Sequence, residues 1–69
     1  SFNVDSPQLI NLDIYDINGY KIKNLTNKFY NQGFHQIKWT PDPSISSGVY
    51  IIRLESNNIR LSHKALYLK

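Results

Sequence analysis

The sequence predicts an all-β domain, a small antiparallel sandwich or barrel of about six to seven strands. Three observations indicate this class. Apolar and polar residues alternate in short runs, turn-forming residues separate the runs, and no window carries the apolar spacing of an amphipathic helix. The chain has 69 residues and no cysteine. It therefore forms one small domain that no disulfide can stabilise.

The strands are expected wherever apolar residues recur at every second position. The clearest strand covers residues 9–16, where Ile10, Leu12 and Ile14 point to one side and polar residues to the other. This pattern is typical of a strand with one buried face. The other extended segments are expected at residues 1–6, 21–26, 34–39, 49–56 and 59–68.

Two connecting segments are expected between these strands. Residues 27–33 have the composition of a polar loop. Residues 40–48 cannot form a regular ladder, because Pro41 and Pro43 lack the amide hydrogen that a ladder needs. Between the two segments, residues 34–39 place three side chains on one side of a strand: His35, Ile37 and Trp39.

The first hairpin allows two registers. A two-residue turn would pair Ile14 with Lys23 and place a lysine on the core face. A three-residue loop that ends at Gly19 pairs Ile14 with Ile22 instead, and glycine readily adopts the left-handed conformation that this loop requires. We therefore expect the three-residue loop. Leu25 then leaves the face of Ile22, so a bulge or a strand end should lie between them.

The second hairpin fits a two-residue turn at Asn57 and Asn58, because asparagine tolerates a positive φ. One face then pairs Leu54 with Leu61, Ile52 with His63, and Tyr50 with Ala65. The other face carries Val49, Ile51, Arg53, Lys64, Leu66 and Leu68. The hairpin is thus apolar on both faces. We favour a bulge near Lys64 that rotates Leu66 and Leu68 inward, and the alternative is a docking surface.

No group of residues predicts a catalytic or metal site. Both histidines lie in predicted strands, and no serine stands in a nucleophile-elbow sequence. The acidic residues near residue 16 lack the spacing of a calcium loop, and turn formation explains them. The net charge is only +3 and the basic residues are dispersed, which argues against nucleic acid. We expect no enzyme, no cofactor, no metal and no direct membrane insertion, since no apolar run is long enough.

Four segments resemble a known family when they are taken in order. They read LDIYDINGYKIKNL (residues 12–25), GFHQIKW (33–39), SGVYIIRLES (47–56) and HKALYLK (63–69). Their order and spacing are similar to those of the C-terminal sorting domain of the type IX secretion system, the Por secretion family of Bacteroidota. Asp16 and Gly19 match the family's turn. Tyr20 stands where the family usually has Arg or Lys, and Ser47 where it often has Pro.

The resemblance implies an immunoglobulin-like β-sandwich that acts as a secretion signal. Such a domain directs an N-terminal cargo from the periplasm through an outer-membrane translocon, to the cell surface or the medium. A sortase-like peptidase typically removes it there. We expect recognition to involve Gly48, Tyr50, Lys64, Leu66, Leu68 and Lys69. Gly48 would allow a tight entry into its strand and Tyr50 would anchor the core. Residues with a structural role are expected at Gly19, Trp39, Ile52 and Leu54.

Three other functions stay open. The exposed aromatic residues could stack on sugars, as in a carbohydrate-binding accessory module of a secreted enzyme. The pattern around Gly48 and Tyr50 also resembles the immunoglobulin-like domain of flagellar hook-capping proteins. An enzyme is the least supported. The whole chain is expected to be a single domain, residues 1–69, from a larger secreted protein, with Ser1 at a fragment boundary or a processing site.

Overall fold

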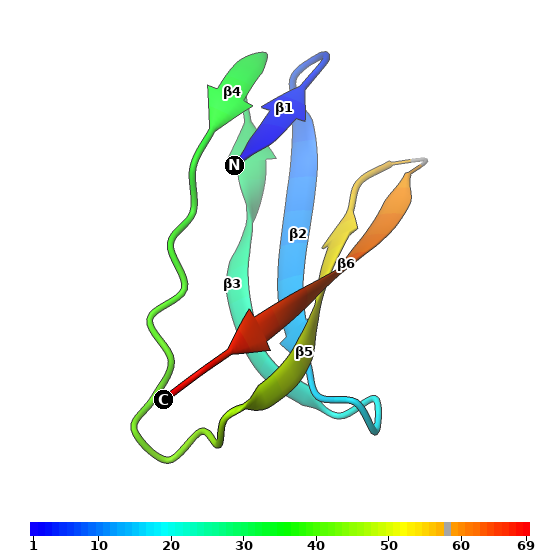
Figure 1. Cartoon of the computed structure of the whole chain (residues 1–69). Helices are drawn as coiled ribbons and strands as arrows, with labels where there is room; N and C mark the ends of the chain where they lie inside the picture. Colours follow the sequence, from blue (N-terminus) through cyan, green and yellow to red (C-terminus); the bar gives the residue numbers. More distant parts are fainter. Residues whose placement is uncertain (58) are drawn as a thin grey trace.

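The computed structural model describes residues 1–57 and 59–69. Its strands are β1 (Phe2–Val4), β2 (Gln8–Tyr15), β3 (Lys21–Tyr30), β4 (Gly33–His35), β5 (Gly48–Glu55) and β6 (Arg60–Tyr67). β1 pairs with β4, and the other strands form an antiparallel sheet in the order β3-β2-β5-β6 (Figure 1). In the part of the chain that the structure describes, no helix is long and apolar enough to cross a membrane. The predicted all-β sandwich is confirmed, with six strands.

The core lies between the two sheets and is built on β2. Ile10, Leu12 and Ile14 are buried on its inner face, as the alternation predicts. Val4 from β1 and Tyr30 from β3 complete the buried cluster around Ile10 and Leu12. Removing one such side chain from water contributes about 1.5–3 kcal/mol. Few residues are fully buried, so each has a large share in the stability of so small a domain.

The turn between β2 and β3 has the predicted three-residue loop. The amide of Asp16 donates a hydrogen bond to the carbonyl of Tyr20 over 2.9 Å, so the loop holds residues 17–19. Gly19 has a φ of 89°, which is the left-handed conformation that the loop requires. One carboxylate oxygen of Asp16 accepts hydrogen bonds from the backbone amides of Asn18 and Tyr20, at 2.9 and 3.0 Å. These hydrogen bonds of Asp16 therefore stabilise the conformation of the loop.

The predicted pairing of Ile14 with Ile22 is wrong. Ile14 lies opposite Lys23, because Ile22 is skipped in the ladder and forms a bulge. The bulge keeps Ile22 half-buried and leaves Lys23 exposed, so the register changes without moving a lysine into the core. A second shift skips Leu25 and confirms the irregularity expected between Ile22 and Leu25.

The expected boundaries of β3 and β4 are also wrong. Residues 27–33 are not a loop, since β3 continues to Tyr30. The Tyr30 side chain is buried and its hydroxyl is hydrogen-bonded to that of Thr26 at 2.7 Å, which stabilises the extension. The strand expected at 34–39 is shorter, because β4 ends at His35. The alternation continues beyond it without a ladder: Ile37 and Trp39 remain half-buried and Gln36 and Lys38 exposed.

The register predicted for the β5–β6 hairpin is confirmed. Leu54 pairs with Leu61, Ile52 with His63, and Tyr50 with Ala65. The predicted Asn57-Asn58 turn includes residue 58, which lies outside the described residues. The predicted bulge near Lys64 is wrong, because the register continues unbroken from the Glu55–Arg60 pair to the Gly48–Tyr67 pair. Tyr67 takes the inward position beside Trp39, at 6.0 Å between ring centres. A bulge would have turned Tyr67 away from Trp39. Because there is no bulge in this ladder, Leu66 points outward and is exposed.

Candidate functional site

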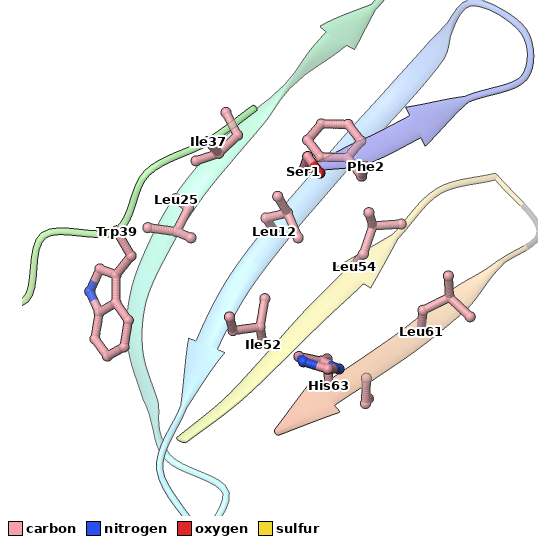
Figure 2. Close-up of a pocket in the computed structure, with 11 residues that line it drawn as sticks. Ser1, Phe2, Leu12, Leu25, Ile37, Trp39, Ile52, Leu54, Leu61 and His63 are labelled. Atoms are coloured by element: carbon pink, nitrogen blue, oxygen red, sulfur yellow. The ribbon is translucent and has the colours of Figure 1, made fainter. Parts of the chain in front are cut away.

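Two parts of the molecule are candidates for a functional site. The first is a pocket of about 660 Å³ between the sheets. Figure 2 shows side chains from β2, β3, β5, β6 and the segment after β4 around this space. They are almost all apolar, and His63 is the only titratable side chain among them. Among the described residues, no group of three His, Cys, Asp or Glu could hold a metal ion. The pocket can accept an apolar group, but it holds no catalytic set.

The second part is the outer face of the four-stranded sheet near the end of β6. The registers place four side chains in one row across this face, in the order Lys21, Tyr15, Ile51 and Lys64. The next row toward the end of the sheet contains Val49 opposite Leu66. Side chains on the same face of neighbouring strands lie about 4.5–5.5 Å apart at their Cβ atoms. These rows therefore form one continuous surface.

This surface is apolar and exposed. Leu66 retains 67% of its accessible area, Leu68 74% and Val49 40%. A contiguous exposed apolar surface is a candidate for contact with another molecule. We use the name β5–β6 patch for the surface formed by Val49, Ile51, Lys64, Leu66 and Leu68. Its outer boundary is β6, the edge strand of the sheet.

Arg53 and Tyr15 lie beside the patch on the same outer face, toward the centre of the sheet. The guanidinium of Arg53 lies over the ring of Tyr15, 4.7 Å from its centre, in a favourable cation–π contact. Arg53 Nε is buried and has no hydrogen-bond partner among the described residues. The contact that stabilises the Arg53 side chain is therefore its stacking on Tyr15, and not a hydrogen bond from its buried Nε. Arg53 also separates the patch from the polar centre of the sheet, because it lies opposite Asp13 in the β2–β5 register.

Asp13 is the buried charge of the outer face, with 1% of its area exposed. Its carboxylate accepts hydrogen bonds from Asn24 Nδ2 at 2.8 Å and from Asn11 Nδ2 at 2.6 Å. Lys21 Nζ lies 3.5 Å away. Burial raises the pKa of Asp13, but the hydrogen bonds from Asn24 and Asn11 and the charge of Lys21 together lower it below its ordinary value of 3.8. Asp13 is therefore ionised at neutral pH and stabilises the centre of the sheet.

Lys69 is held against the segment before β5. Its backbone amide donates to Ser47 Oγ at 2.8 Å, and its ammonium group donates to the carbonyl of Pro43. These contacts join residues 22 and 26 positions apart in the sequence. They fix the direction in which the chain leaves β6, and with it the position of Leu68.

Tyr50 and Gly48 lie at the start of β5 but do not join the patch. Tyr50 is 8% exposed on the inner face, and its hydroxyl donates to the carbonyl of Ser46 at 2.7 Å. Its ring packs edge-to-face against Trp39, at 5.5 Å between ring centres. Gly48 opens the strand beside it. Tyr50 therefore lies on the face opposite the patch, at the start of the same strand.

The residues expected to be recognised are thus divided between two faces. Lys64 and Leu66 share the outer face, Leu68 follows them, and Lys69 is turned toward Pro43. Ile52 and Leu54, expected to be structural, line the inner pocket. Sequence reasoning missed Tyr67, which packs against Trp39. Its position two residues after Ala65 could have indicated an inward side chain.

The aromatic side chains that could stack on sugars are Tyr15, Tyr20, Phe29, Tyr30 and Phe34. Tyr15 is covered by Arg53, and Tyr30 is buried in the core. Phe29 is 63% exposed, but it pairs with Leu9 at the other end of the sheet. A stacking platform needs several ring faces presented together. Tyr15 and Tyr30 are not available for such a platform, whereas Tyr20 and Phe34 are exposed in the β2–β3 loop and in β4.

The comparisons with known proteins agree with the motifs. A family model described as a secretion system C-terminal sorting domain matches residues 1–67. Neither the search of curated proteins nor the search of solved structures finds a match.

Proposed function

The chain belongs to the family of secretion system C-terminal sorting domains, and we propose that it delivers an attached N-terminal cargo through the type IX outer-membrane translocon. Membership makes it a secretion-sorting signal. The family is not catalytic, and the enzymatic activity, if there is one, belongs to the cargo. The proposed destination is the cell surface or the medium. A sortase-like peptidase would separate the domain from its cargo there.

The observation that carries this proposal is the exposed apolar patch beside an edge strand. β6 ends the sheet, so its outer backbone groups are available to another strand. Recognition by strand addition uses those groups for affinity and the neighbouring side chains for specificity. Leu66 and Leu68 would enter apolar pockets of the receptor, and Lys64 would contact an acidic group. A signal needs such a surface, whereas a domain that only completes a sandwich does not.

The other expected residues would support this surface from behind. Tyr50 packs between Trp39 and Ser46 and fixes the start of β5. Gly48 precedes it at the entry into the strand. Lys69 would orient the segment after β6 through its contact with Pro43. We propose that loss of these contacts moves Leu68 and weakens recognition, although none of these three residues presents its own side chain on the patch.

A fusion experiment tests the function. Residues 1–69 are attached to the C-terminus of a fluorescent reporter that carries an N-terminal signal peptide for export to the periplasm, in a bacterium with a type IX system. Surface reporter is measured on intact cells. We expect surface signal from the fusion and none from the reporter alone. A strain without the translocon should retain the fusion in the periplasm. Equal surface signal in that strain would contradict the proposed route, and no surface signal in either strain would contradict the sorting function.

The mass of the exported reporter tests the removal step. Removal by a peptidase predicts a surface or medium product that lacks these 69 residues, while the periplasmic form keeps them. A surface product of full mass would show that the domain is retained, and would leave its role in export unchanged.

A further inference from the structure

The proposed function places a cargo before Ser1, and on that basis we propose that the connection from the cargo is part of the fold. The residues immediately before Ser1 would continue β1, pair with residues 37–39 and cover the apolar pocket between the sheets. The connection would then be a strand with a defined register where it meets the domain, and not a free linker.

The segment after β4 has the side-chain pattern of a strand without the partner of a strand. Ile37 and Trp39 are half-buried while Lys38 between them is exposed, as in a strand that has one face on a core. In the part of the chain that the structure describes, residues 37–39 belong to no ladder. They also take part in none of the backbone hydrogen bonds outside the ladders. Their backbone groups are therefore open to a neighbouring strand.

The register of β1 and β4 determines where a continuation of β1 would lie. Phe2 pairs with His35 in an antiparallel ladder, so each step back along β1 moves one residue forward beyond His35. The first residue before Ser1 would lie opposite Ile37, and the third would lie opposite Trp39. Phe2 packs against the buried cluster, and side chains alternate along a strand. The first and third residues before Ser1 would therefore point inward as well.

The pocket provides the space for these two inward side chains. It has a volume of about 660 Å³, and both Ser1 and Phe2 belong to its lining. Figure 2 shows Ser1 and Phe2 at one end of this space, with Ile37 and Trp39 along one side and Leu61 on the other. Leu61 retains 60% of its accessible area although it lines the pocket. Apolar side chains are favoured in such a place, because they remove this apolar surface from water.

A segment joined to Ser1 is favoured over a free ligand or a separate protein. Ser1 lies in the lining of the pocket, so a segment attached to it begins at the site and has a high effective concentration there. A separate molecule would first lose its translational and rotational freedom. The occupant therefore has a stated chemistry: an extended segment with apolar side chains at the first and third positions before Ser1.

This strand would also determine where the domain is separated from its cargo. Exposed, unpaired connections are the preferred sites of proteolysis, and the hydrogen bonding of the backbone decides whether a segment is accessible. The peptidase would therefore cut on the N-terminal side of the paired residues, which would leave together with the domain.

Two extensions of the purified chain with the same composition test the pairing. Thr-Val-Thr-Val before Ser1 places valine at the first and third positions, and Val-Thr-Val-Thr places threonine there. We expect the first extension to raise the thermal midpoint by at least about 4 °C over the second, measured by the fluorescence of Trp39, the one tryptophan of the chain. The second extension should unfold near the midpoint of the unextended chain.

Hydrogen exchange of the backbone amides locates the new strand. At least one amide among residues 37–39 should exchange about tenfold more slowly with Thr-Val-Thr-Val than with Val-Thr-Val-Thr, because pairing protects it.

Equal midpoints and equal exchange for the two extensions would overturn the proposal. A midpoint that rises with protein concentration would overturn it too, because a second copy would then fill the pocket. These measurements contain no secretion machinery, so their failure leaves the sorting function standing. A failure of export would in turn leave the measured pairing unchanged.

Discussion

Asp13 illustrates how one side chain organises the outer face of the sheet. It stands in the middle of an alternating strand, on the side where the sequence predicts contact with solvent. Neighbouring amides cover it instead: Asn24 Nδ2 donates to it and also to Asn11 Oδ1 at 2.8 Å. A buried carboxylate is stable only when its oxygens are hydrogen-bonded. The polar centre of the sheet is therefore as much a part of the structure as the core.

Removal of the Asn24 side chain should destabilise the fold, because the buried charge of Asp13 loses a hydrogen-bond donor. Asn24→Ala should lower the free energy of unfolding by about 1–3 kcal/mol, because Asp13 loses a donor while it remains buried. Asn27→Ala is the matched control, since Asn27 is exposed in the same strand and its loss should change stability by less than about 0.5 kcal/mol. Urea unfolding measures both. Similar losses in the two variants would contradict the account of Asp13.

The lowered pKa of Asp13 also predicts the effect of acid. Its folded pKa lies below the ordinary 3.8, so its contribution to stability is complete above that pH. The contribution is lost as the pH falls through the folded pKa. The free energy of unfolding should therefore decrease below about pH 4, and Asp13→Asn should show a smaller decrease. Urea titrations at several acidic pH values test this. An unchanged pH dependence in Asp13→Asn would refute it.

At the scale of elements, the alternation predicted the positions of β2, β5 and β6 and the register of the last hairpin. It failed where tertiary contacts decide the outcome. β3 extends to Tyr30 because the core buries that ring, and the bulge at Ile22 depends on which side chain the core retains. The bulge near Lys64 was wrongly predicted because Leu66 was assigned to the core from its apolarity alone. Tyr67 occupies that side instead.

Gly19 is the position where the β2–β3 loop is most sensitive. Gly19→Ala should destabilise the domain by about 1 kcal/mol, because the φ of 89° disfavours a side chain. Crowding would not contribute, since no atom lies within 4 Å of the added Cβ. Gly19→Asn should cost less, because asparagine tolerates this conformation. Thermal unfolding of the two variants makes the comparison. An equal or larger loss for Asn would contradict the conformational explanation.

For the candidate site too, alternation predicts which residues share a face but not which distant segments come into contact. Alternation alone places Lys64 and Leu66 on a common face, so this part of the patch could be predicted. The contacts of Lys69 with Ser47 and Pro43 could not, because they join distant positions through a segment without regular structure. The inward position of Tyr50 followed from the hairpin register, and its hydrogen bond to Ser46 did not.

At the scale of the whole molecule, the domain is a small sandwich with an incomplete second layer. The two-stranded sheet covers only part of the four-stranded one, and the segment with Trp39 covers another part. A chain of this size buries a modest fraction of its surface and is marginally stable. It nevertheless leaves large apolar side chains exposed, among them Leu66 and Leu68 at the end of β6. That combination is expected of a domain that is selected for recognition.

The most direct test of this account is the amount of reporter on the cell surface when the patch alone is changed. Fusions that carry Leu66→Ser/Leu68→Ser are compared with fusions that carry Leu9→Ser/Phe29→Ser, after both are shown to be folded. The account predicts that the first pair loses most of its surface reporter and accumulates in the periplasm, while the second pair is exported normally. Normal export of the Leu66→Ser/Leu68→Ser fusion would contradict the claim that the β5–β6 patch is the recognised surface.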